Sequence, residues 1–349
     1  MSFCSNAFCE EGNRENDILT EKNCNQVYTS QALSFDPIPF GNRYGQNGVT
    51  YLENGDVLLR FFAPNASKVE FSGMPGSLAG EEKRPLNRCK GGYWELTLSG
   101  LPTKYLAIIF YVDGIEAMNP CVNIGAGYDR MINYVDLPHA EGKFYEVNRV
   151  PHGSIRYEFY HSSLTGRPRD CLVYTPPGYD GEKKRYPVLY LQHGGGENET
   201  NWFWQAKLNF ILDNLLAEEK AEEMIVVCNS GEVYRNGEKP TPMDFEALLM
   251  QDVIPFINNR FRVLTDPSHT AVAGLSRGAY QALYIGLRQL GRFRSIGMFS
   301  GRTTVESMHQ IGGTADHLPL LFDAEKMNDS LDLLFCSVGE QEEERATGI

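Results

Sequence analysis

The sequence is poor in positive charge and lacks the features of several partner classes. It has 32 Lys and Arg against 45 Asp and Glu, a formal net charge of −13. A chain with so little positive charge is not expected to bind nucleic acid or an anionic membrane. No apolar stretch approaches the length of a transmembrane span. Residues 1–20 carry Glu10, Glu11, Glu15 and Asp17 and no apolar core of a signal peptide, which predicts a cytoplasmic protein.

The cysteines also lack the spacing of a metal site. There are eight, scattered along the chain, and none has the paired spacing of zinc ligands. They could form four disulfides, but several lie within apolar runs, such as Cys228 at the end of Ile225–Cys228. The pattern therefore favours buried free thiols in a reducing compartment, and no metal ion is expected.

Composition divides the chain into a leader, two domains and a linker. Residues 1–35 are polar and irregular, as in a loosely held leader. Residues 36–140 contain short alternating segments such as Asp56–Phe62, bounded by Gly, Pro and Asn, and predict an all-β sandwich. Residues 141–152 are interpreted as the linker. Residues 153–349 have apolar strands separated by helical patterns, typical of a mostly parallel sheet with helices on both faces.

A nucleophile elbow is the strongest motif of the second domain. Gly274–Gly278 reads Gly-Leu-Ser-Arg-Gly and fits the pattern G-x-S-x-G. The apolar strand Thr270–Ala273 runs directly into it, and a helical segment follows from Ala279. A strand-turn-helix of this kind holds its serine in a strained, exposed position, so Ser276 is the predicted nucleophile.

A glycine-rich loop supplies the predicted oxyanion hole. His193–Gly196 reads His-Gly-Gly-Gly directly after an apolar strand. Glycines let amide groups approach an acyl oxygen as negative charge develops on it, and we expect the amides of Gly195 and Arg277 to be the two donors. His193 precedes this loop, and we interpret it as ordering the loop by hydrogen bonding rather than as a general base.

The chain has no obvious base or acid for this serine. In an elbow-type hydrolase the order is serine, acid, histidine. Only His309 and His317 follow Ser276, and both precede the strand that should deliver the acid, so they are interpreted as surface histidines. After that strand, Glu342 is the candidate acid and Glu340 the second choice; an acidic turn exposed to solvent is the alternative interpretation.

Both domains resemble known families. From Pro151 to Glu344 the chain resembles the feruloyl and acetyl-xylan esterase-like α/β-hydrolases related to esterase D. The matching stretches are Val173–Tyr179, Tyr186–Glu197 with Trp202, Gly274–Gly278, and Met298–Gly301. The preceding sandwich resembles the immunoglobulin-like modules attached to glycan-active enzymes, through Arg60–Ala66, Gly91–Glu95 and Tyr111–Gly114. Its Trp94 and Tyr111 are interpreted as core aromatics, with a carbohydrate platform as the alternative.

The resemblance implies a serine carboxylic-ester hydrolase with an acyl-enzyme mechanism. Ser276 carries over as the nucleophile and the backbones of Gly195 and Arg277 as oxyanion donors, although the family usually has methionine in place of Arg277. Glu342 stands where the family has aspartate. The implied substrates are feruloyl or acetyl esters of plant-wall xylan oligosaccharides, and no metal or cofactor is required. The family continues through a helix, a strand and a loop bearing the histidine, so the resemblance predicts that this part is missing here.

Two other functions remain open. One is a catalytically impaired protein that binds glycans or another partner, because loss of triad members leaves only residual catalysis. The other is a hydrolase of small acyl esters or thioesters. Without a further strand, the segment Leu331–Cys336 is expected to form an exposed apolar edge, which favours aggregation or pairing with another chain, including a second copy.

Overall fold

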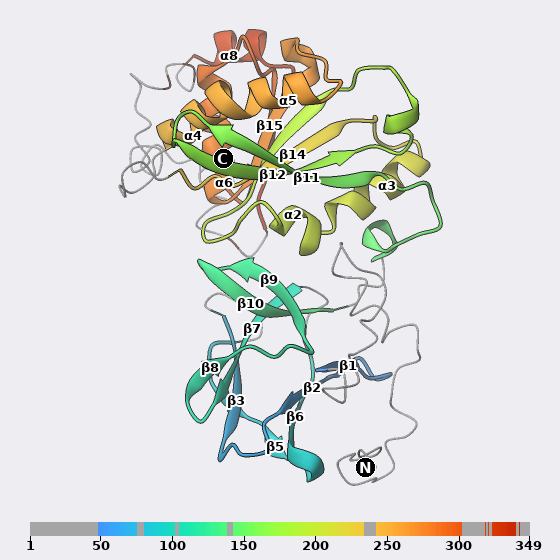
Figure 1. Cartoon of the computed structure of the whole chain (residues 1–349), viewed down its shortest axis with the longest axis vertical. Coiled ribbons are helices and arrows are strands. Elements are labelled where there is room, and N and C mark those ends of the chain that lie inside the picture. The colour runs from blue at the N-terminus through green and yellow to red at the C-terminus, as the bar shows by residue number, and fades with distance from the viewer. Residues whose placement is uncertain are drawn as a thin grey trace. The chain divides into compact units, whose positions relative to one another are not determined.

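The computed structural model describes residues 48–74, 80–101, 105–137, 142–233, 242–301, 318, 320, 323–339 and 342. The chain forms two compact units, shown in Figure 1. Of the described residues, one unit comprises those up to Val147 with Trp204–Lys207, and the other comprises Asn148–Phe203 and those from Leu208 onward. The division falls inside the predicted linker, and the predicted leader lies outside the described residues. No helix in the described ranges is long and apolar enough to cross a membrane.

The first unit consists of two antiparallel sheets. The first has the order β1-β2-β6-β5, with β1 at Val49–Tyr51, β2 at Val57–Phe62, β6 at Tyr93–Leu98 and β5 at Asn87–Arg88. The second has the order β4-β3-β7-β10-β9 with β8 beside β7: β4 Arg84–Pro85, β3 Val69–Gly73, β7 Tyr105–Val112, β10 Arg130–Asp136, β9 Asn123–Gly127 and β8 Ile115–Ala117. The rings of Phe61 on one sheet and Phe110 on the other pack at a tilt of 54° with their centroids 5.1 Å apart, so the two sheets share one core.

Of the two aromatic residues of the alternative glycan platform, Trp94 lies in this core. Trp94 is buried and its indole N–H donates a hydrogen bond to the carbonyl oxygen of Ala63 at 2.9 Å. Tyr111 is buried as well. The interpretation as a core aromatic is confirmed for Trp94, whereas Tyr111 lies outside the core cluster, with Lys83 Nζ 3.6 Å from its ring centroid.

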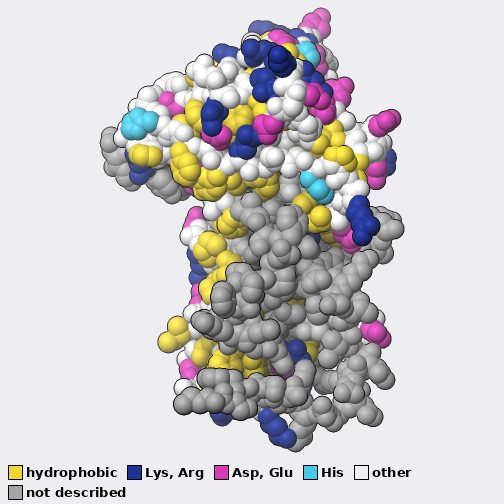
Figure 2. Space-filling view, turned by 45° about the vertical axis from the view of Figure 1, so that its right-hand side comes forward, with side chains coloured by type: hydrophobic (Ala, Val, Ile, Leu, Met, Phe, Trp, Pro, Cys, Tyr) yellow, Lys and Arg dark blue, Asp and Glu magenta, His cyan; other side chains and the backbone are white. Residues whose placement is uncertain are grey.

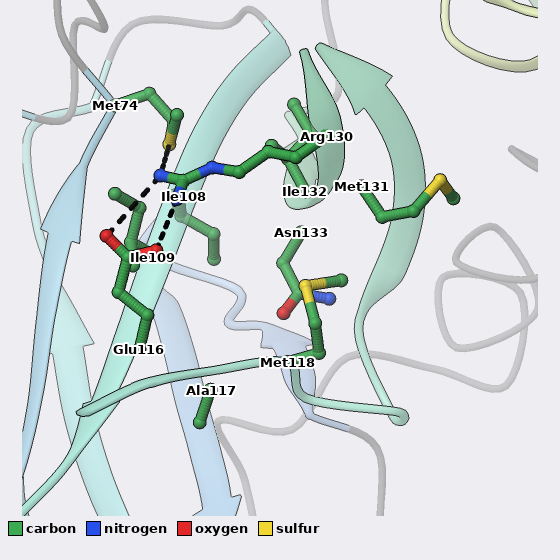
Figure 3. Close-up of a pocket in the computed structure, with 10 residues that line it drawn as sticks. All are labelled: Met74, Ile108, Ile109, Glu116, Ala117, Met118, Arg130, Met131, Ile132 and Asn133. Atoms are coloured by element: carbon green, nitrogen blue, oxygen red, sulfur yellow. Dashed lines mark hydrogen bonds and ion pairs between the residues drawn. The ribbon is translucent and has the colours of Figure 1, made fainter. Parts of the chain in front are cut away.

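A shallow hollow lies on the second sheet of this unit. It has a volume of about 190 Å³ and is lined mainly by methionine and isoleucine side chains, with an ion pair between Arg130 and Glu116 at one side (Figure 3). It contains no nucleophile or histidine. The predicted nucleophile Ser276 and the predicted donors Gly195 and Arg277 all lie in the second unit.

The second unit is built on a seven-stranded sheet with the order β11-β12-β14-β13-β15-β16-β17. β11 and β12 form an antiparallel edge, and β14, β13, β15, β16 and β17 run parallel to one another. The bounds are β11 Ser154–Ser162, β12 Arg167–Thr175, β13 Val188–Gln192, β14 Ile225–Asn229, β15 Thr270–Leu275, β16 Ser295–Phe299 and β17 Leu333–Ser337. In a parallel sheet, functional side chains gather at the carboxyl ends of the strands.

Helices cover both faces of this sheet. They are α2 Asn201–Trp204, α3 Leu208–Ala217, α4 Pro242–Leu248, α5 Ile254–Arg260, α6 Arg277–Arg288 and α8 Ala324–Ser330, with a π-turn at Leu249–Val253 and 3-10 turns at Tyr179–Gly181 and Pro267–His269. Apolar residues of α4, α5 and α6 share one buried cluster with those of the strands. Figure 1 shows α2 and α3 on the other side of the sheet. The predicted mostly parallel sheet with helices on both faces is confirmed.

The last described strand is an open edge. β17 pairs only with β16 among the described residues, and Leu333, Leu334 and Phe335 remain between 38% and 53% exposed. This agrees with the expected apolar edge. An exposed edge strand with apolar side chains favours pairing with another strand, so aggregation through β17 stays a prediction.

The cysteines agree only in part with the predicted free thiols. Cys171 and Cys228 are buried and free, and Cys121 and Cys336 are partly buried and free. Cys89 is disulfide-bonded, so the prediction was wrong for this residue. It lies in a partly exposed turn before β6 rather than in an apolar run, and sequence spacing does not show which thiols meet in space. The cytoplasmic location stays a prediction.

Candidate active site

Ser276 lies in a sharp turn between β15 and α6. Its φ of 52° and ψ of −113° are rare for a residue with a side chain, and such backbone strain costs about 1–3 kcal/mol. The turn is fixed from both sides: the Ser276 N–H donates to the carbonyl oxygen of Phe299 at 2.8 Å, and its carbonyl accepts from the N–H of Ala279 at 3.0 Å. The strand-turn-helix geometry is the one that the motif predicts for an exposed nucleophile.

The two glycines of the motif let three backbone segments meet. A methyl group on Gly274 would lie 2.4 Å from the backbone of Gly278. A methyl group on Gly278 would lie 2.5 Å from the carbonyl oxygen of His193 and 2.8 Å from that of Gln192. Only glycine fits at either position, because these contacts are with backbone atoms that cannot rotate away. The elbow and the His193–Gly196 loop are therefore in direct contact.

Among the described residues, the amides of the two predicted oxyanion donors have no hydrogen-bond partner, whereas the amides of their neighbours have one. The N–H of Gly194 donates to the Glu197 carboxylate at 2.7 Å, and the N–H of Ser276 is bonded to Phe299. Within the described ranges no hydrogen bond occupies the N–H of Gly195 or that of Arg277. Space beside Gly195 is open, since an added methyl group would meet nothing within 4 Å. Two unpartnered amides next to a nucleophile are what an oxyanion hole requires.

His193 is a hydrogen-bonding element of the loop. It is 1% exposed, its Nδ1 lies 2.7 Å from the carbonyl oxygen of Gly194, and its Nε2 accepts from the N–H of Gly231 at 3.0 Å. A nitrogen that accepts carries no proton, so His193 is the neutral tautomer with its proton on Nδ1. Burial lowers the pKa of His193 from 6.5 to about 4. Both nitrogens are occupied, which agrees with its interpretation as an ordering residue.

This burial predicts a pH-dependent stability. The unfolded chain binds the His193 proton near pH 6.5 and the folded chain only near pH 4, so protonation favours unfolding between these values. The contribution of His193 is fully present above pH 6.5 and decreases as the pH falls toward 4, by up to about 3 kcal/mol. We expect an NMR titration to show a neutral His193 ring at pH 5.5, and the unfolding free energy of His193→Gln to vary less over this range. A ring that titrates near pH 6.5 would contradict the burial argument.

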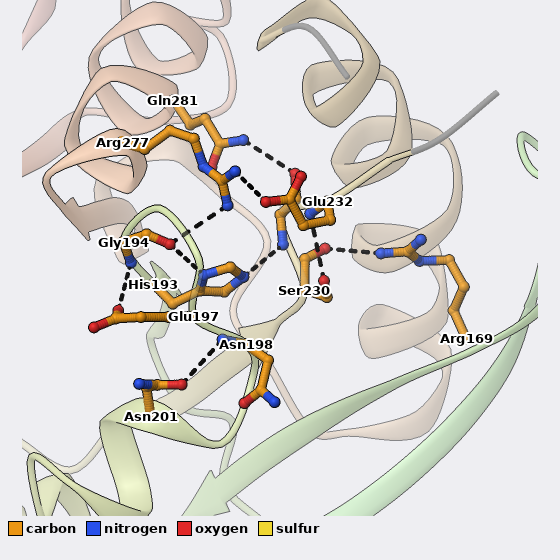
Figure 4. Close-up of polar contacts among 11 residues, drawn as sticks. Arg169, His193, Gly194, Glu197, Asn198, Asn201, Ser230, Glu232, Arg277 and Gln281 are labelled. Carbon is orange, nitrogen blue, oxygen red and sulfur yellow. Dashed lines mark hydrogen bonds and ion pairs between the residues drawn. The ribbon is translucent and has the colours of Figure 1, made fainter. Parts of the chain in front are cut away.

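The side chain of Arg277 connects the elbow to two loops. Its guanidinium forms an ion pair with Glu232 and donates to the carbonyl oxygen of Gly194 at 3.4 Å (Figure 4). The loop that carries Glu232 follows β14 and is also held by Gln281, whose amide donates to the carbonyl oxygen of Gly231 at 3.2 Å. All these groups therefore lie at the carboxyl ends of β13, β14 and β15.

The candidate acid lies at the same edge of the sheet. Glu342 follows β17, and its carboxylate accepts a hydrogen bond from the Ser300 hydroxyl at 3.1 Å. Phe299 pairs with Ser337 and Leu275 with Phe299, so the ends of β15, β16 and β17 are aligned. Neighbouring strands lie about 5 Å apart, so Ser276 and Glu342 follow strands that are two spacings apart. Glu340 lies outside the described residues.

None of the described histidines is bonded to Ser276. His152 pairs with Asp213, and His269 pairs with Asp266. His161 is exposed on the edge strand β11, and His193 is locked in the loop. His309 and His317 lie outside the described residues, so their interpretation as surface residues stays a prediction.

Sequence reasoning missed two acidic side chains of this site. Glu197, which holds the Gly194 N–H, was part of the quoted loop motif, but nothing in its spacing revealed the contact. Glu232 lies 45 positions before Arg277, and no local pattern connects them. Both contacts depend on which strand ends meet in space, which is a property of the sheet order.

The seven-stranded sheet with helices on both faces is the fold of an α/β-hydrolase, and comparisons with known proteins give the family. Residues 162–344 match the family described as "Putative esterase", so the chain belongs to this esterase family. The matched segment contains the elbow and the His193–Gly196 loop. The predicted resemblance to esterases is confirmed, whereas the immunoglobulin-like topology of the first unit stays a prediction.

The relatives include enzymes of xylan breakdown. The chain is 34% identical over 279 residues to an endo-1,4-beta-xylanase/feruloyl esterase of Xylanibacter ruminicola, covering 77% of this chain and 38% of that one. It is 38% identical over 155 residues to endo-1,4-beta-xylanase Y of Acetivibrio thermocellus, covering 43% and 13%. The chain thus spans less than two fifths of the length of these relatives. A crystal structure of the enterobactin esterase of Shigella flexneri shares the fold, with a TM-score of 0.55 and 15% identity over 84% of this chain and 90% of that one.

Proposed function

We propose that this chain hydrolyses carboxylic esters through an acyl-enzyme on Ser276. The observation that carries the proposal is the strained turn at Ser276 beside the amides of Gly195 and Arg277, which no described group occupies. The Ser276 oxygen attacks the ester carbonyl, and the two amides stabilise the negative charge that develops on the acyl oxygen. The alcohol leaves with a proton, and water then releases the acid and restores the serine hydroxyl. Glu342 is the proposed acidic residue of this site.

The proposed substrates are feruloyl or acetyl esters of xylan oligosaccharides. The support is the similarity to the Xylanibacter ruminicola xylanase/feruloyl esterase, which extends over 77% of this chain. The net charge of −13 is also compatible with an uncharged sugar chain rather than an anionic polymer. An oligosaccharide ester and a small acyl thioester differ in their alcohol or thiol side, so the ratio of their kcat/KM values separates the two substrate classes.

The experiment is a comparison of kcat/KM on methyl ferulate, acetylated xylan oligomers and a short acyl thioester. We expect the two wall-type esters to be turned over faster than the thioester, with no turnover by Ser276→Ala. A higher kcat/KM on the thioester would overturn the proposed substrate class. A folded sample without turnover on any of them would contradict the esterase proposal and favour a binding function.

A further inference from the structure

We propose that the Arg277 side chain is a positioning residue for the oxyanion hole, an inference that rests on the proposed function. Its guanidinium and His193 hold the carbonyl group of Gly194, and they thereby aim the N–H group of Gly195 at the acyl oxygen. Arg277 then serves the hole twice: its own backbone N–H is one donor, and its side chain orients the other.

The geometry of one peptide group carries this inference. The carbonyl of Gly194 and the N–H of Gly195 belong to the same planar trans unit, so they point in opposite directions. Two donors occupy the carbonyl side: His193 Nδ1 at 2.7 Å and an Arg277 guanidinium nitrogen at 3.4 Å. A carbonyl held in this way leaves the N–H of Gly195 directed to the opposite side of the peptide unit. Glycine would otherwise let this peptide rotate freely.

Each of the two donors is itself held in place. The N–H of Gly231 donates to His193 Nε2 at 3.0 Å, which keeps the ring proton on Nδ1 and pointed at Gly194. Glu232, the next residue, forms the ion pair with Arg277. The loop after β14 therefore fixes both donors through adjacent residues, as Figure 4 shows. Loss of the Arg277–Glu232 ion pair is therefore expected to loosen the Arg277 guanidinium and to leave the His193 ring in place.

The charge of Arg277 adds to the orientation. A hydrogen bond to a carbonyl polarises its peptide group and makes the N–H on the other side a stronger donor, and a charged donor does so most. The guanidinium is also a fixed positive charge near the position where the oxyanion develops. This charge stabilises the transition state more than the bound substrate, because the negative charge forms only during the reaction. Methionine at this position can supply neither effect.

The first test is steady-state kinetics on 4-nitrophenyl acetate for Arg277→Met, Arg277→Lys and Glu232→Gln. Misaligned donors lower transition-state stabilisation, so we expect Arg277→Met to lower kcat about tenfold and to change KM less than about twofold. Arg277→Lys keeps the charge and a donor and should recover part of the loss, and Glu232→Gln should lie between. The control is Arg260→Met, which removes a comparable ion pair, with Glu158, on α5 and should leave kcat unchanged.

The second test does not require turnover. In glycine-labelled protein we expect Arg277→Met to shift the Gly194 carbonyl 13C and the Gly195 amide proton signals upfield, with no shift in Arg260→Met. Unshifted signals, or a change in KM alone, would overturn the positioning role. Wild-type protein with no more turnover than Ser276→Ala would count against the proposed function instead, and the NMR signals would still decide whether Arg277 polarises this peptide.

Discussion

Replacing Ser276 by glycine is expected to abolish ester hydrolysis and to raise the free energy of unfolding by about 1 kcal/mol. Ser276 has φ 52° and ψ −113°, the mirror image of an ordinary extended conformation, which glycine adopts as readily as its counterpart. Relief of the strain contributes about 1–3 kcal/mol, and the greater freedom of glycine in the unfolded chain removes about 0.5–1 kcal/mol of this. The change in activity is far larger, since loss of a serine nucleophile lowers kcat by about 10⁶-fold.

The matched variant is Ser276→Ala. Alanine removes the same hydroxyl but keeps a β-carbon, and with it the strain, so it should lose turnover without gaining stability. Urea unfolding of wild type and both variants, followed with turnover of 4-nitrophenyl acetate, measures the two effects separately. If the glycine variant is less stable than the alanine variant, the Ser276 backbone is not strained in the folded protein. Turnover that survives in both variants would rule out Ser276 as the nucleophile.

How far the sequence predicts the fold depends on where each strand lies. β13, β14, β15 and β16 were identified from their apolar runs, because they are covered on both faces. The apolar run of β17 was identified as well, although its side chains stay partly exposed. β11 and β12 were missed, since β11 is a half-exposed edge whose mixture of polar and aromatic residues has no clear period. In the first unit the same limit applied to β9 and β10, where glycine and polar residues interrupt the alternation.

The candidate site also has a part that local sequence predicts and a part that it does not. Ser276, Gly195 and the Arg277 amide were predictable, because a turn motif and its flanking elements are local in sequence. The contacts of Glu197 and Glu232 were not, because a carboxylate finds its partner through the sheet order. The disulfide at Cys89 was missed for the same reason. Contacts within the elbow can therefore be derived from sequence, whereas contacts between the loops around it require the structure.

Replacing Gly278 by alanine is expected to lower both stability and turnover. The new methyl group would lie 2.5 Å from the carbonyl oxygen of His193 and 2.8 Å from that of Gln192. Backbone atoms cannot rotate away, so α6 and the His193–Gly196 loop must separate, at a cost of about 1–3 kcal/mol. The separation also moves the amides of Gly195 and Arg277 apart, and a displacement of about 1 Å can lower kcat about 100-fold. The control is Gly291→Ala, whose methyl group would meet nothing within 4 Å.

A double variant of Gly278 and Arg277 shows whether kcat falls because the oxyanion donors lose their alignment or because the protein becomes less rigid as a whole. Gly278 sets the distance between the elbow and the loop, and the Arg277 side chain sets the orientation of the Gly194–Gly195 peptide within it. Once Gly278→Ala has displaced the loop, the guanidinium has no aligned carbonyl to hold, so adding Arg277→Met should cost little more kcat. If kcat of the double variant falls by the product of the two single-variant factors, the two residues act independently. A folded Gly278→Ala protein with wild-type kcat would show that the contact between elbow and loop does not align the donors.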